Sequence, residues 1–321
     1  MKDLFSLTPE NLQTMQIVDW GYTEQMQATS FDKLQNWVEN NEHEPLGYLA
    51  DERMLKRKNL ELIYPFAKSA FVFLFDYTSS KKSLEELAPE NKVASYALGF
   101  EDQDYHYWIQ EKLHLIQAEL KKEVGEFEFG ISLDIHPVLE RDLAYRSGLG
   151  WFGKNSMLIS RSLGSYFLIG SIIIDRKLNL NQRELETDHC GSCTRCLEAC
   201  PTKAINNDRT VNAKKCISTY TIELFKDAPA PEGYPTATHE VFGCDICQEV
   251  CPWNLKPMAR ADETQFSENS LIEFFNRPIE VIYDQVNQMS NREYKRFFAK
   301  TSLERLGKKG LLKNLDKFIT D

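Results

Sequence analysis

Residues 190–201 read CGSCTRCLEACP, and this stretch decides how the whole chain is interpreted. Its spacing, C-x2-C-x2-C-x3-C-P, is typical of bacterial ferredoxins with two clusters, in which the fourth cysteine binds the other cluster. Cys216 follows alone, and residues 244–252 read CDICQEVCP. All eight cysteines of the chain lie between residues 190 and 251, and eight thiolates are what two [4Fe-4S] clusters require. The sequence therefore predicts an iron–sulfur region that transfers electrons.

The ferredoxin pattern also predicts which cysteines share a cluster. The last cysteine of each run crosses over to the other cluster, and Cys216 takes the place of the middle cysteine that the second run lacks. The predicted ligands of the first cluster are Cys190, Cys193, Cys196 and Cys251. The predicted ligands of the second cluster are Cys200, Cys216, Cys244 and Cys247.

Two other uses of the cysteines fit the sequence less well. The first residues, MKDLFSLTPENLQ, are polar and lack the apolar region of an export signal, which predicts a cytoplasmic chain whose thiols stay reduced instead of forming disulfides. Zinc sites usually combine two C-x2-C pairs that are a dozen or more residues apart. A third cysteine only two residues after the first pair is poor for zinc and suits a [4Fe-4S] cluster.

Size and charge limit the partners. The chain has 321 residues, enough for two or three domains. Its longest apolar stretches, such as 69–75 and 166–174, are too short to cross a bilayer, so no membrane association is expected. The net charge of −10 argues against general binding of nucleic acid. From Arg292 to Lys317, however, nine basic residues stand against three acidic ones, a net charge of +6.

A basic tail on an acidic chain is the electrostatic pattern of a nucleic-acid partner, and a solvated helix face is the alternative. The candidate nucleic-acid contacts are Arg292, Lys295, Arg296, Lys300, Arg305, Lys308, Lys309 and Lys313.

The fold class predicted from hydrophobic periodicity is α+β with three parts. Residues 1–180 alternate between helix and strand, as in an α/β or α+β catalytic domain; residues 181–260 hold the cysteines in a ferredoxin-like domain; and residues 261–321 form a small basic helical appendage. The predicted helices of the first part are 31–40, 102–124 and 141–147. Its predicted strands are 69–75, 127–135, 157–159 and 166–174.

Two motifs in the first part carry possible chemistry. Residues 148–153 read GLGWFG, a formal G-x-G-x-x-G, but a dinucleotide site needs a strand before it and a helix after it, and the predicted order here is the reverse. Asp134 opens the segment DIHP at the end of a predicted strand. A buried carboxyl there would have a raised pKa and serve as a general acid, whereas a helix cap or a partner of Arg141 is the alternative.

These motifs together resemble the epoxyqueuosine reductases, which are similar in their core to reductive dehalogenases. The resemblance rests on DIHPVLER at 134–141, GLGWFGKN at 148–155, DYH at 104–106, CISTY at 216–220 and the cysteine series. It implies a base-off cobalamin beside the two clusters and a tRNA substrate with epoxyqueuosine at the wobble position. The implied reaction removes the epoxide with two electrons and two protons through Co(I) cobalamin, with Asp134 as proton donor and an unknown external electron donor.

The resemblance also implies an α/β cobalamin-binding domain and a HEAT-like C-terminal region that contacts tRNA. The chain is expected to be a monomer. The residues expected to hold cobalamin are Arg57, Tyr96, Ala97, His106, Asp134, Lys154, Asn155, Ser156, Met157, Leu158, Ser218, Thr219 and Tyr220.

Two other functions use the same cysteines. A reductive dehalogenase-like enzyme acting on a small organohalide would need the same cofactors, and the basic tail and missing export signal favour tRNA over it. A ferredoxin-type electron carrier would need only the clusters, and would leave residues 1–180 without a task. Cobalamin absorption bands distinguish the carrier from the enzymes.

Overall fold

The computed structural model describes residue 4 and residues 7–87, 91–100, 103–225, 228–235, 239–261 and 270–319. The chain divides into two compact units. The first unit is Met1–Asp76 with Trp108–Cys193, and the second is Tyr77–Tyr107 with Thr194–Asp321. This division differs from the boundaries predicted after residues 180 and 260, because residues 77–107 belong with the later part of the chain. The three functional domains stay a prediction, and residues 262–269, 320 and 321 of the third lie outside the described residues.

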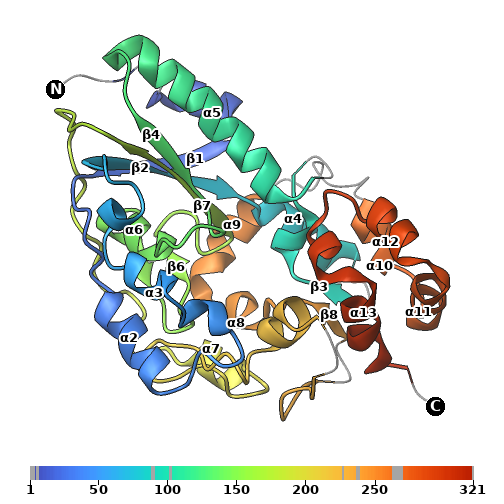
Figure 1. The fold of residues 1–321 in the computed structure, drawn as a ribbon. Helices are drawn as coiled ribbons and strands as arrows, with labels where there is room; N and C mark the ends of the chain where they lie inside the picture. Colours follow the sequence, from blue (N-terminus) through green and yellow to red (C-terminus); the bar gives the residue numbers. More distant parts are fainter. Residues whose placement is uncertain are drawn as a thin grey trace. The chain divides into compact units, whose positions relative to one another are not determined.

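The first unit is built on a four-stranded sheet of order β1-β2-β7-β4 (Figure 1). Every neighbouring pair of strands is antiparallel, which decides between the α/β and α+β alternatives in favour of α+β. The strands are β1 (Ile17–Thr23), β2 (Ser69–Asp76), β4 (Phe129–Ser132) and β7 (Phe167–Ile174). The strands predicted at 69–75, 127–135 and 166–174 are thereby confirmed.

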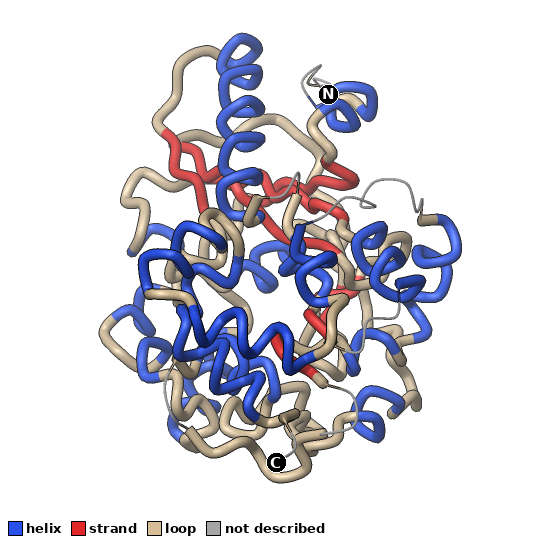
Figure 2. The backbone as a smooth tube through the Cα atoms, turned by 90° about the vertical axis from the view of Figure 1, so that its right-hand side faces the viewer, coloured by secondary structure: helices blue, strands red, loops and turns tan. Residues whose placement is uncertain are grey.

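Strand β2 is buried on both faces because a helix covers each side. The long α5 (Tyr105–Val124) runs along one face, and Figure 2 shows it in blue against the red strands. Phe75 meets the edge of the Trp108 ring at 5.8 Å between centroids. Gly170 of β7 lets α5 come close, since a Cβ there would lie 2.9 Å from Ile109. On the other face Val72 and Leu74 pack with Leu143 of α6 (Glu140–Arg146).

The remaining elements of this unit are short. The hairpin β5–β6 pairs Trp151 with Ile159, and the predicted helices at 31–40 and 141–147 are confirmed as α2 and α6. Strand β1 was not predicted, because Asp19 and Gly21 interrupt its apolar pattern. The other bounds are α1 (Pro9–Thr14), α2 (Phe31–Glu39), η2 (Gly47–Leu49), α3 (Arg53–Lys56), η3 (Leu60–Leu62), β5 (Trp151–Phe152) and β6 (Leu158–Ile159).

In the second unit the C-terminal helices share one core with earlier segments. Phe275, Ile282 and Leu311 are buried in the same cluster as Val93 and Phe242, which lie on the parallel strands β3 and β8. The predicted helical tail is therefore present, but it is not a separate appendage. These elements are α4 (Thr78–Leu87), β3 (Lys92–Val93), η4 (Ser95–Leu98), β8 (Glu240–Phe242), α10 (Ser270–Phe275), α11 (Ile279–Gln288), α12 (Asn291–Phe297) and α13 (Ser302–Asp316).

The cysteine region supplies the rest of the second unit. Helix α7 carries Cys196, α8 carries Cys247, and these two short helices pack against each other. Within the described residues, no helix is both long and apolar enough to span a membrane. The bounds are α7 (Arg195–Ala199), the π-helical η5 (Thr219–Glu223), α8 (Ile246–Glu249), η6 (Pro252–Asn254) and α9 (Leu255–Arg260).

Candidate functional site

The four thiols predicted to hold the second cluster are neighbours within the second unit. Burial raises the pKa of Cys247, and the thiols of Cys216 and Cys200 raise it further. Burial likewise raises the pKa of Cys244 and of Cys216, the latter also through Cys200. These thiols interact electrostatically only if they lie close together. Binding of iron would have to displace their protons, as metal binding to thiols does.

Cys200 is already held by hydrogen-bond donors. The Ala204 N–H donates to Cys200 Sγ at 3.3 Å, and Thr202 Oγ1 lies 3.6 Å from the same sulfur. Hydrogen bonds to cluster sulfurs are one of the ways in which a protein sets a reduction potential. The segment after Pro201 therefore places polar groups around the Cys200 sulfur.

All eight cysteines are free thiols in the structure. Cys196 and Cys251 of the predicted first cluster belong to the second unit, whereas Cys190 and Cys193 end the first unit. Among the described residues no three His, Cys, Asp or Glu side chains converge closely enough to hold a single metal ion. The first ligand set therefore stays a prediction.

Backbone and side-chain hydrogen bonds hold the loop between Cys190 and Cys193 in place. The Cys193 N–H donates to Cys190 O at 3.1 Å, and the Cys190 N–H donates to the Asp188 carboxylate at 2.8 Å. Lys154 Nζ donates to Gly191 O at 2.7 Å and to Cys193 O at 2.9 Å. The ammonium group of Lys154 thus binds the first cysteine loop, and its predicted contact with cobalamin stays a prediction.

Asp134 lies in the turn that follows β4, and His136 closes this turn. The His136 N–H donates to Leu133 O at 2.9 Å, and the Leu133 N–H donates to His136 Nδ1 at 3.1 Å. The Asp134 side chain is exposed, so the expectation that it is buried is wrong. An exposed carboxyl is accessible to a substrate.

The desolvated acid beside Asp134 is Glu140, at the start of α6. Desolvation raises the pKa of Glu140, Arg141 lowers it, and Asp134 raises it. Arg57 also interacts with Glu140, and burial lowers the pKa of the Arg57 guanidinium. Arg57 is 8% exposed, and its Nη1 finds no hydrogen-bond partner among the described residues. The sequence did not predict a role for Glu140, since a single carboxyl in a charged segment does not indicate a site.

The G-x-G-x-x-G segment forms a turn and a hairpin. Gly148 follows α6 with φ +71°, and a Cβ on Gly150 would lie 2.2 Å from Ile159 O, so the glycines permit the close pairing of β5 and β6. No helix follows, which confirms that the motif is not a dinucleotide site.

The predicted cofactor residues after this motif form a tight corner. Ser156 has φ +66°, and Arg141 Nη1 donates to its carbonyl oxygen. Asn155 is buried and accepts the Met157 N–H at 3.3 Å. Leu158 is buried in the sheet core, so its side chain supports the hairpin. The corner is thereby held rigidly within the first unit, and its predicted contact with cobalamin stays a prediction.

In the second unit the predicted residues Tyr96, Ala97 and His106 lie close together. His106 Nδ1 lies 2.5 Å from the Asp104 carboxylate, and its ring stacks on Tyr105 at 4.0 Å. Tyr96 meets the edge of Tyr105 at 5.9 Å. Asp104 is the first residue of the DYH motif, and the sequence did not predict a role for it. Its position two residues before His106 could have indicated the contact between them.

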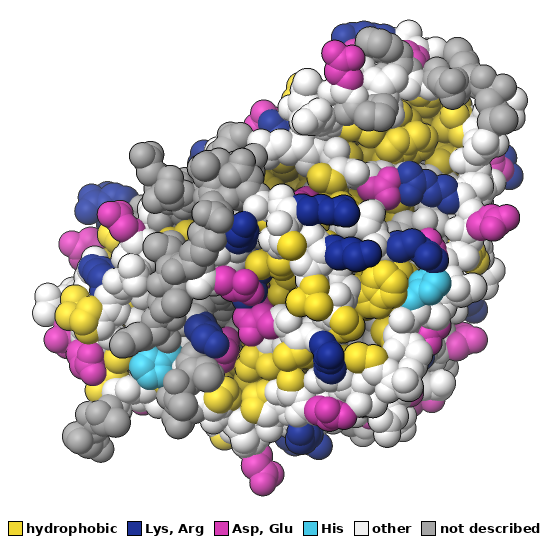
Figure 3. All heavy atoms as spheres, turned by 180° about the vertical axis from the view of Figure 1, so that it is seen from behind, with side chains coloured by type: hydrophobic (Ala, Val, Ile, Leu, Met, Phe, Trp, Pro, Cys, Tyr) yellow, Lys and Arg dark blue, Asp and Glu magenta, His cyan; other side chains and the backbone are white. Residues whose placement is uncertain are grey.

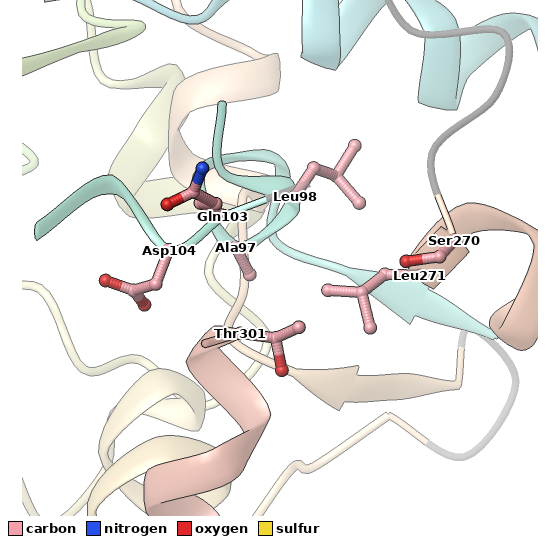
Figure 4. A pocket seen from close by; sticks show the side chains of 7 residues that line it. All are labelled: Ala97, Leu98, Gln103, Asp104, Ser270, Leu271 and Thr301. Atoms are coloured by element: carbon pink, nitrogen blue, oxygen red, sulfur yellow. The ribbon is translucent and has the colours of Figure 1, made fainter. Parts of the chain in front are cut away.

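A shallow hollow without room for a water molecule lies beside these residues (Figure 4). The Asp104 carboxylate points away from the apolar side chains around it. The hollow is far too small for a macrocycle, because drug-sized ligands already occupy pockets of roughly 300–1,000 Å³. Its lining residues are Ala97, Leu98, Gln103, Asp104, Ser270, Leu271 and Thr301.

Thr219 and Tyr220 begin the π-helical η5, and Ser218 is its N-cap residue, two positions after Cys216. Burial raises the pKa of Tyr220 to about 12, and its hydroxyl oxygen has no hydrogen-bond partner in the described part of the chain. Lys313 Nζ donates to Tyr220 O and to Leu224 O and lies 3.9 Å from the Tyr220 ring centroid. Burial lowers the pKa of Lys313 to about 8.

The predicted nucleic-acid contacts fall into two groups. Lys313 holds η5, Lys308 Nζ donates to Asn287 O and Met289 O, and Arg305 pairs with Glu223 at 2.7 Å. These three cations therefore have structural partners. The side chains of the others are exposed, namely Arg292, Lys295, Arg296, Lys300 and Lys309. On the face drawn in Figure 3, Lys and Arg side chains are interspersed with hydrophobic and acidic ones.

Two segments of the chain match models of known protein families. The 4Fe-4S double cluster binding domain matches residues 189–254, and Epoxyqueuosine reductase QueG, DUF1730, matches residues 57–134. The curated epoxyqueuosine reductase of Cyclobacterium marinum is 37% identical over 286 residues, which cover 88% of this chain and 86% of that protein. This chain belongs to the epoxyqueuosine reductase family. It is accordingly an oxidoreductase with a double-cluster domain.

Solved structures of epoxyqueuosine reductases share the fold. One from Bacillus subtilis, in which the catalytic loop is swung out of the active site, is 27% identical with a TM-score of 0.74. Another, with an epoxyqueuosine-modified tRNA-Tyr stem loop, is 26% identical with a TM-score of 0.72. Both similarities cover 96% of this chain and 79% of the other chain.

Proposed function

We propose that this chain reduces epoxyqueuosine to queuosine in tRNA, as a monomer in the cytoplasm. The observation that carries the proposal is its membership of the epoxyqueuosine reductase family over most of both chains. A related reductase has been solved with a modified tRNA stem loop, which supports tRNA as the substrate. The gathered thiols of the second unit support the supply of electrons through iron–sulfur clusters.

The proposed reaction takes up two electrons and two protons. Both carbon–oxygen bonds of the epoxide break, a carbon–carbon double bond forms, and the oxygen leaves as water. The electrons come one at a time from an external low-potential donor, because [4Fe-4S] clusters carry single electrons. The protein must therefore bring tRNA, an electron path and a proton donor together.

Two predicted cobalamin contacts fit a polar ligand. Arg57 Nη1 in the first unit and the Tyr220 hydroxyl in the second are buried polar atoms to which the described residues offer no hydrogen-bond partner. Such atoms are costly unless a ligand or water satisfies them, and the amide side chains of a corrin ring supply suitable acceptors. Cobalamin, when bound, supplies a strong reductant for the epoxide. Lys154 is a weaker candidate contact, since Gly191 and Cys193 occupy its ammonium group.

Asp134 is proposed as the proton donor to the leaving oxygen. Its exposed carboxyl sits on a turn that His136 fixes, beside the desolvated Glu140. A positioned general acid typically contributes on the order of 10²–10⁴ in rate. The first unit therefore offers an accessible acid on a defined turn.

The exposed cations of α12 are proposed to contact tRNA phosphates. Arg292, Lys295 and Arg296 lie on α12, whose start is fixed by a capping box. Ser290 Oγ accepts the Glu293 N–H at 3.2 Å, and the Glu293 carboxylate accepts the Ser290 N–H at 2.8 Å. A rigid helix presents these charges without ordering a flexible segment on binding.

Replacing Asp134 tests the proposed proton donor. Asp134→Asn keeps the shape of the side chain but holds no transferable acidic proton, so turnover should fall about 10²–10⁴-fold. Anaerobic conversion of epoxyqueuosine-containing tRNA, read by nucleoside mass spectrometry, measures this. Iron content and tRNA affinity should stay at the wild-type level. Turnover of the Asn variant close to the wild-type rate would remove Asp134 from the reaction.

A further inference from the structure

Lys154 connects the corner after the G-x-G-x-x-G segment to the first cysteine loop. Both carbonyl groups that it binds, Gly191 O at 2.7 Å and Cys193 O at 2.9 Å, belong to the C-x2-C loop. Gly191 has φ +50°, which turns the loop back toward Cys193. The ammonium group therefore lies within hydrogen-bond distance of the backbone of a predicted cluster ligand.

The same hairpin holds the segment before the loop by a second contact. The Trp151 ring of β5 meets the His189 ring edge to face at 4.7 Å between centroids. His189 also lies 3.0 Å from the Glu186 carboxylate, which Arg161 contacts at 3.3 Å. The ring contact of Trp151 and the ion pair of Arg161 thus hold the segment before the loop. Lys154 binds the loop itself, at Gly191 and Cys193.

We propose that Lys154 positions the 190–193 loop and raises the reduction potential of the cluster that this loop binds. The inference rests on the proposed iron–sulfur function and adds a positioning residue to it. A cluster gains one negative charge when it takes up an electron. A fixed positive charge beside its ligands stabilises that reduced form, since charge and hydrogen bonding near a cluster set its potential.

A carboxylate on the same loop should act in the opposite direction. Asp188 accepts the Cys190 N–H at 2.8 Å, which brings a negative charge to the other ligand of the loop. Removing this charge while keeping an acceptor oxygen, as Asp188→Asn does, should make the reduced cluster more favourable. Lys154 and Asp188 therefore carry opposite charges and should change the potential of the same cluster in opposite directions.

Redox titration of the full-length, cluster-loaded protein, followed by electron paramagnetic resonance, tests the proposal. Lys154→Met should shift the potential of one cluster to more negative values and leave the other in place. Lys154→Arg keeps the charge and should stay near wild type, and Asp188→Asn should shift the same cluster to more positive values. Lys122→Met, which removes an exposed charge paired with Glu119 on α5, is the matched control.

The outcomes separate this inference from the proposed function. Unchanged potentials in Lys154→Met, or an equal shift in Lys154→Arg, would overturn the inference. Loss of about half the iron in Lys154→Met but not in Lys154→Arg would support the positioning role, and Asp188→Asn would then test the effect on potential. A wild-type protein without two [4Fe-4S] signals would instead contradict the proposed function itself.

Discussion

At the scale of single residues, Glu240 is a buried acid close to the cysteines. It lies on β8, four residues before Cys244, and its carboxylate is 3.7 Å from Lys92. Burial raises its pKa from 4.5 to about 7, while Lys92 lowers it and Glu249 and Asp245 raise it. Lys81 also lowers the pKa, and it pairs with Asp245 at 4.0 Å. This acid therefore titrates near neutral pH in the folded chain.

The raised pKa predicts how stability depends on pH. Between pH 4.5 and about 7 the unfolded chain loses the Glu240 proton while the folded chain keeps it, so the free energy of unfolding falls as pH rises. The whole change amounts to at most about 3 kcal/mol. Glu240→Gln stays neutral and should flatten the decline of the anaerobic unfolding temperature between pH 5 and 7.

Glu273→Gln, at an exposed position of α10, is the control for this substitution. The unfolding temperature of this control should fall with rising pH as that of the wild type does. A decline of the same size in Glu240→Gln would contradict the assignment of the titration to Glu240.

For the cysteines, Asp134 and Lys154, the sequence indicated the chemistry of the side chain better than its surroundings. The double-cluster region could be predicted from the cysteine spacing, because cluster ligands follow fixed intervals. The exposure of Asp134 and the contacts of Lys154 with Gly191 and Cys193 could not be predicted. Both depend on how distant segments pack, which no local spacing encodes.

At the scale of elements, a buried ion pair within α6 also binds the two residues that precede α2. Asp142 accepts hydrogen bonds from Thr29 Oγ1 at 2.6 Å, from the Ser30 N–H at 2.8 Å and from Arg146 Nε at 2.6 Å. The side chains of Asp142 and Arg146 are 1% and 2% exposed. The charged run after Asp134 is thus partly structural, which its composition did not reveal.

Removing the Asp142 carboxylate should destabilise the first unit. Asp142→Ala leaves the buried Arg146 without its anion, and breaking a buried pair in this way costs about 3–5 kcal/mol. The anaerobic unfolding temperature should drop clearly. Asp32→Ala, on the exposed side of α2, should stay near wild type. If both variants unfold at the same temperature, the Asp142–Arg146 pair does not stabilise the first unit.

Helix α12 is the element proposed to contact tRNA. Arg292→Glu with Lys295→Glu should weaken tRNA binding and flatten its salt dependence, since each phosphate contact contributes about 0.7–0.9 to the slope of log K against log salt. Lys308→Met serves as the comparison because Lys308 already binds two carbonyl groups at the end of α11. It should leave the slope unchanged. An unaltered slope in the α12 variant would place tRNA elsewhere.

Element positions were predictable where one hydrophobic pattern decided them. The strand at 69–75 is apolar throughout, and the helix at 141–147 has regular periodicity, so both were found. Strand β1 was missed, because pairing with β2 stabilises it more than its own sequence does. The two-residue strands β5 and β6 show the same dependence on a partner.

At the scale of the whole molecule, the chain combines a sheet-based unit with a unit that holds most of the cysteines. Its C-terminal helices are part of the core around Val241 and Phe242, so the tail and the cysteine region fold together. The sequence placed these parts in order along the chain. It did not reveal that residues 77–107 join the later unit, since such long-range packing leaves no periodic signal.

The central claim is that this chain removes the epoxide oxygen from epoxyqueuosine in tRNA with electrons delivered through two clusters. The direct test is anaerobic incubation of the cobalamin- and cluster-loaded protein with epoxyqueuosine-containing tRNA and a low-potential one-electron donor. Nucleoside mass spectrometry should then find queuosine, lighter than the substrate by one oxygen atom, at two electrons consumed per product. Unchanged epoxyqueuosine, from a preparation whose iron content accounts for both clusters, would contradict the claim.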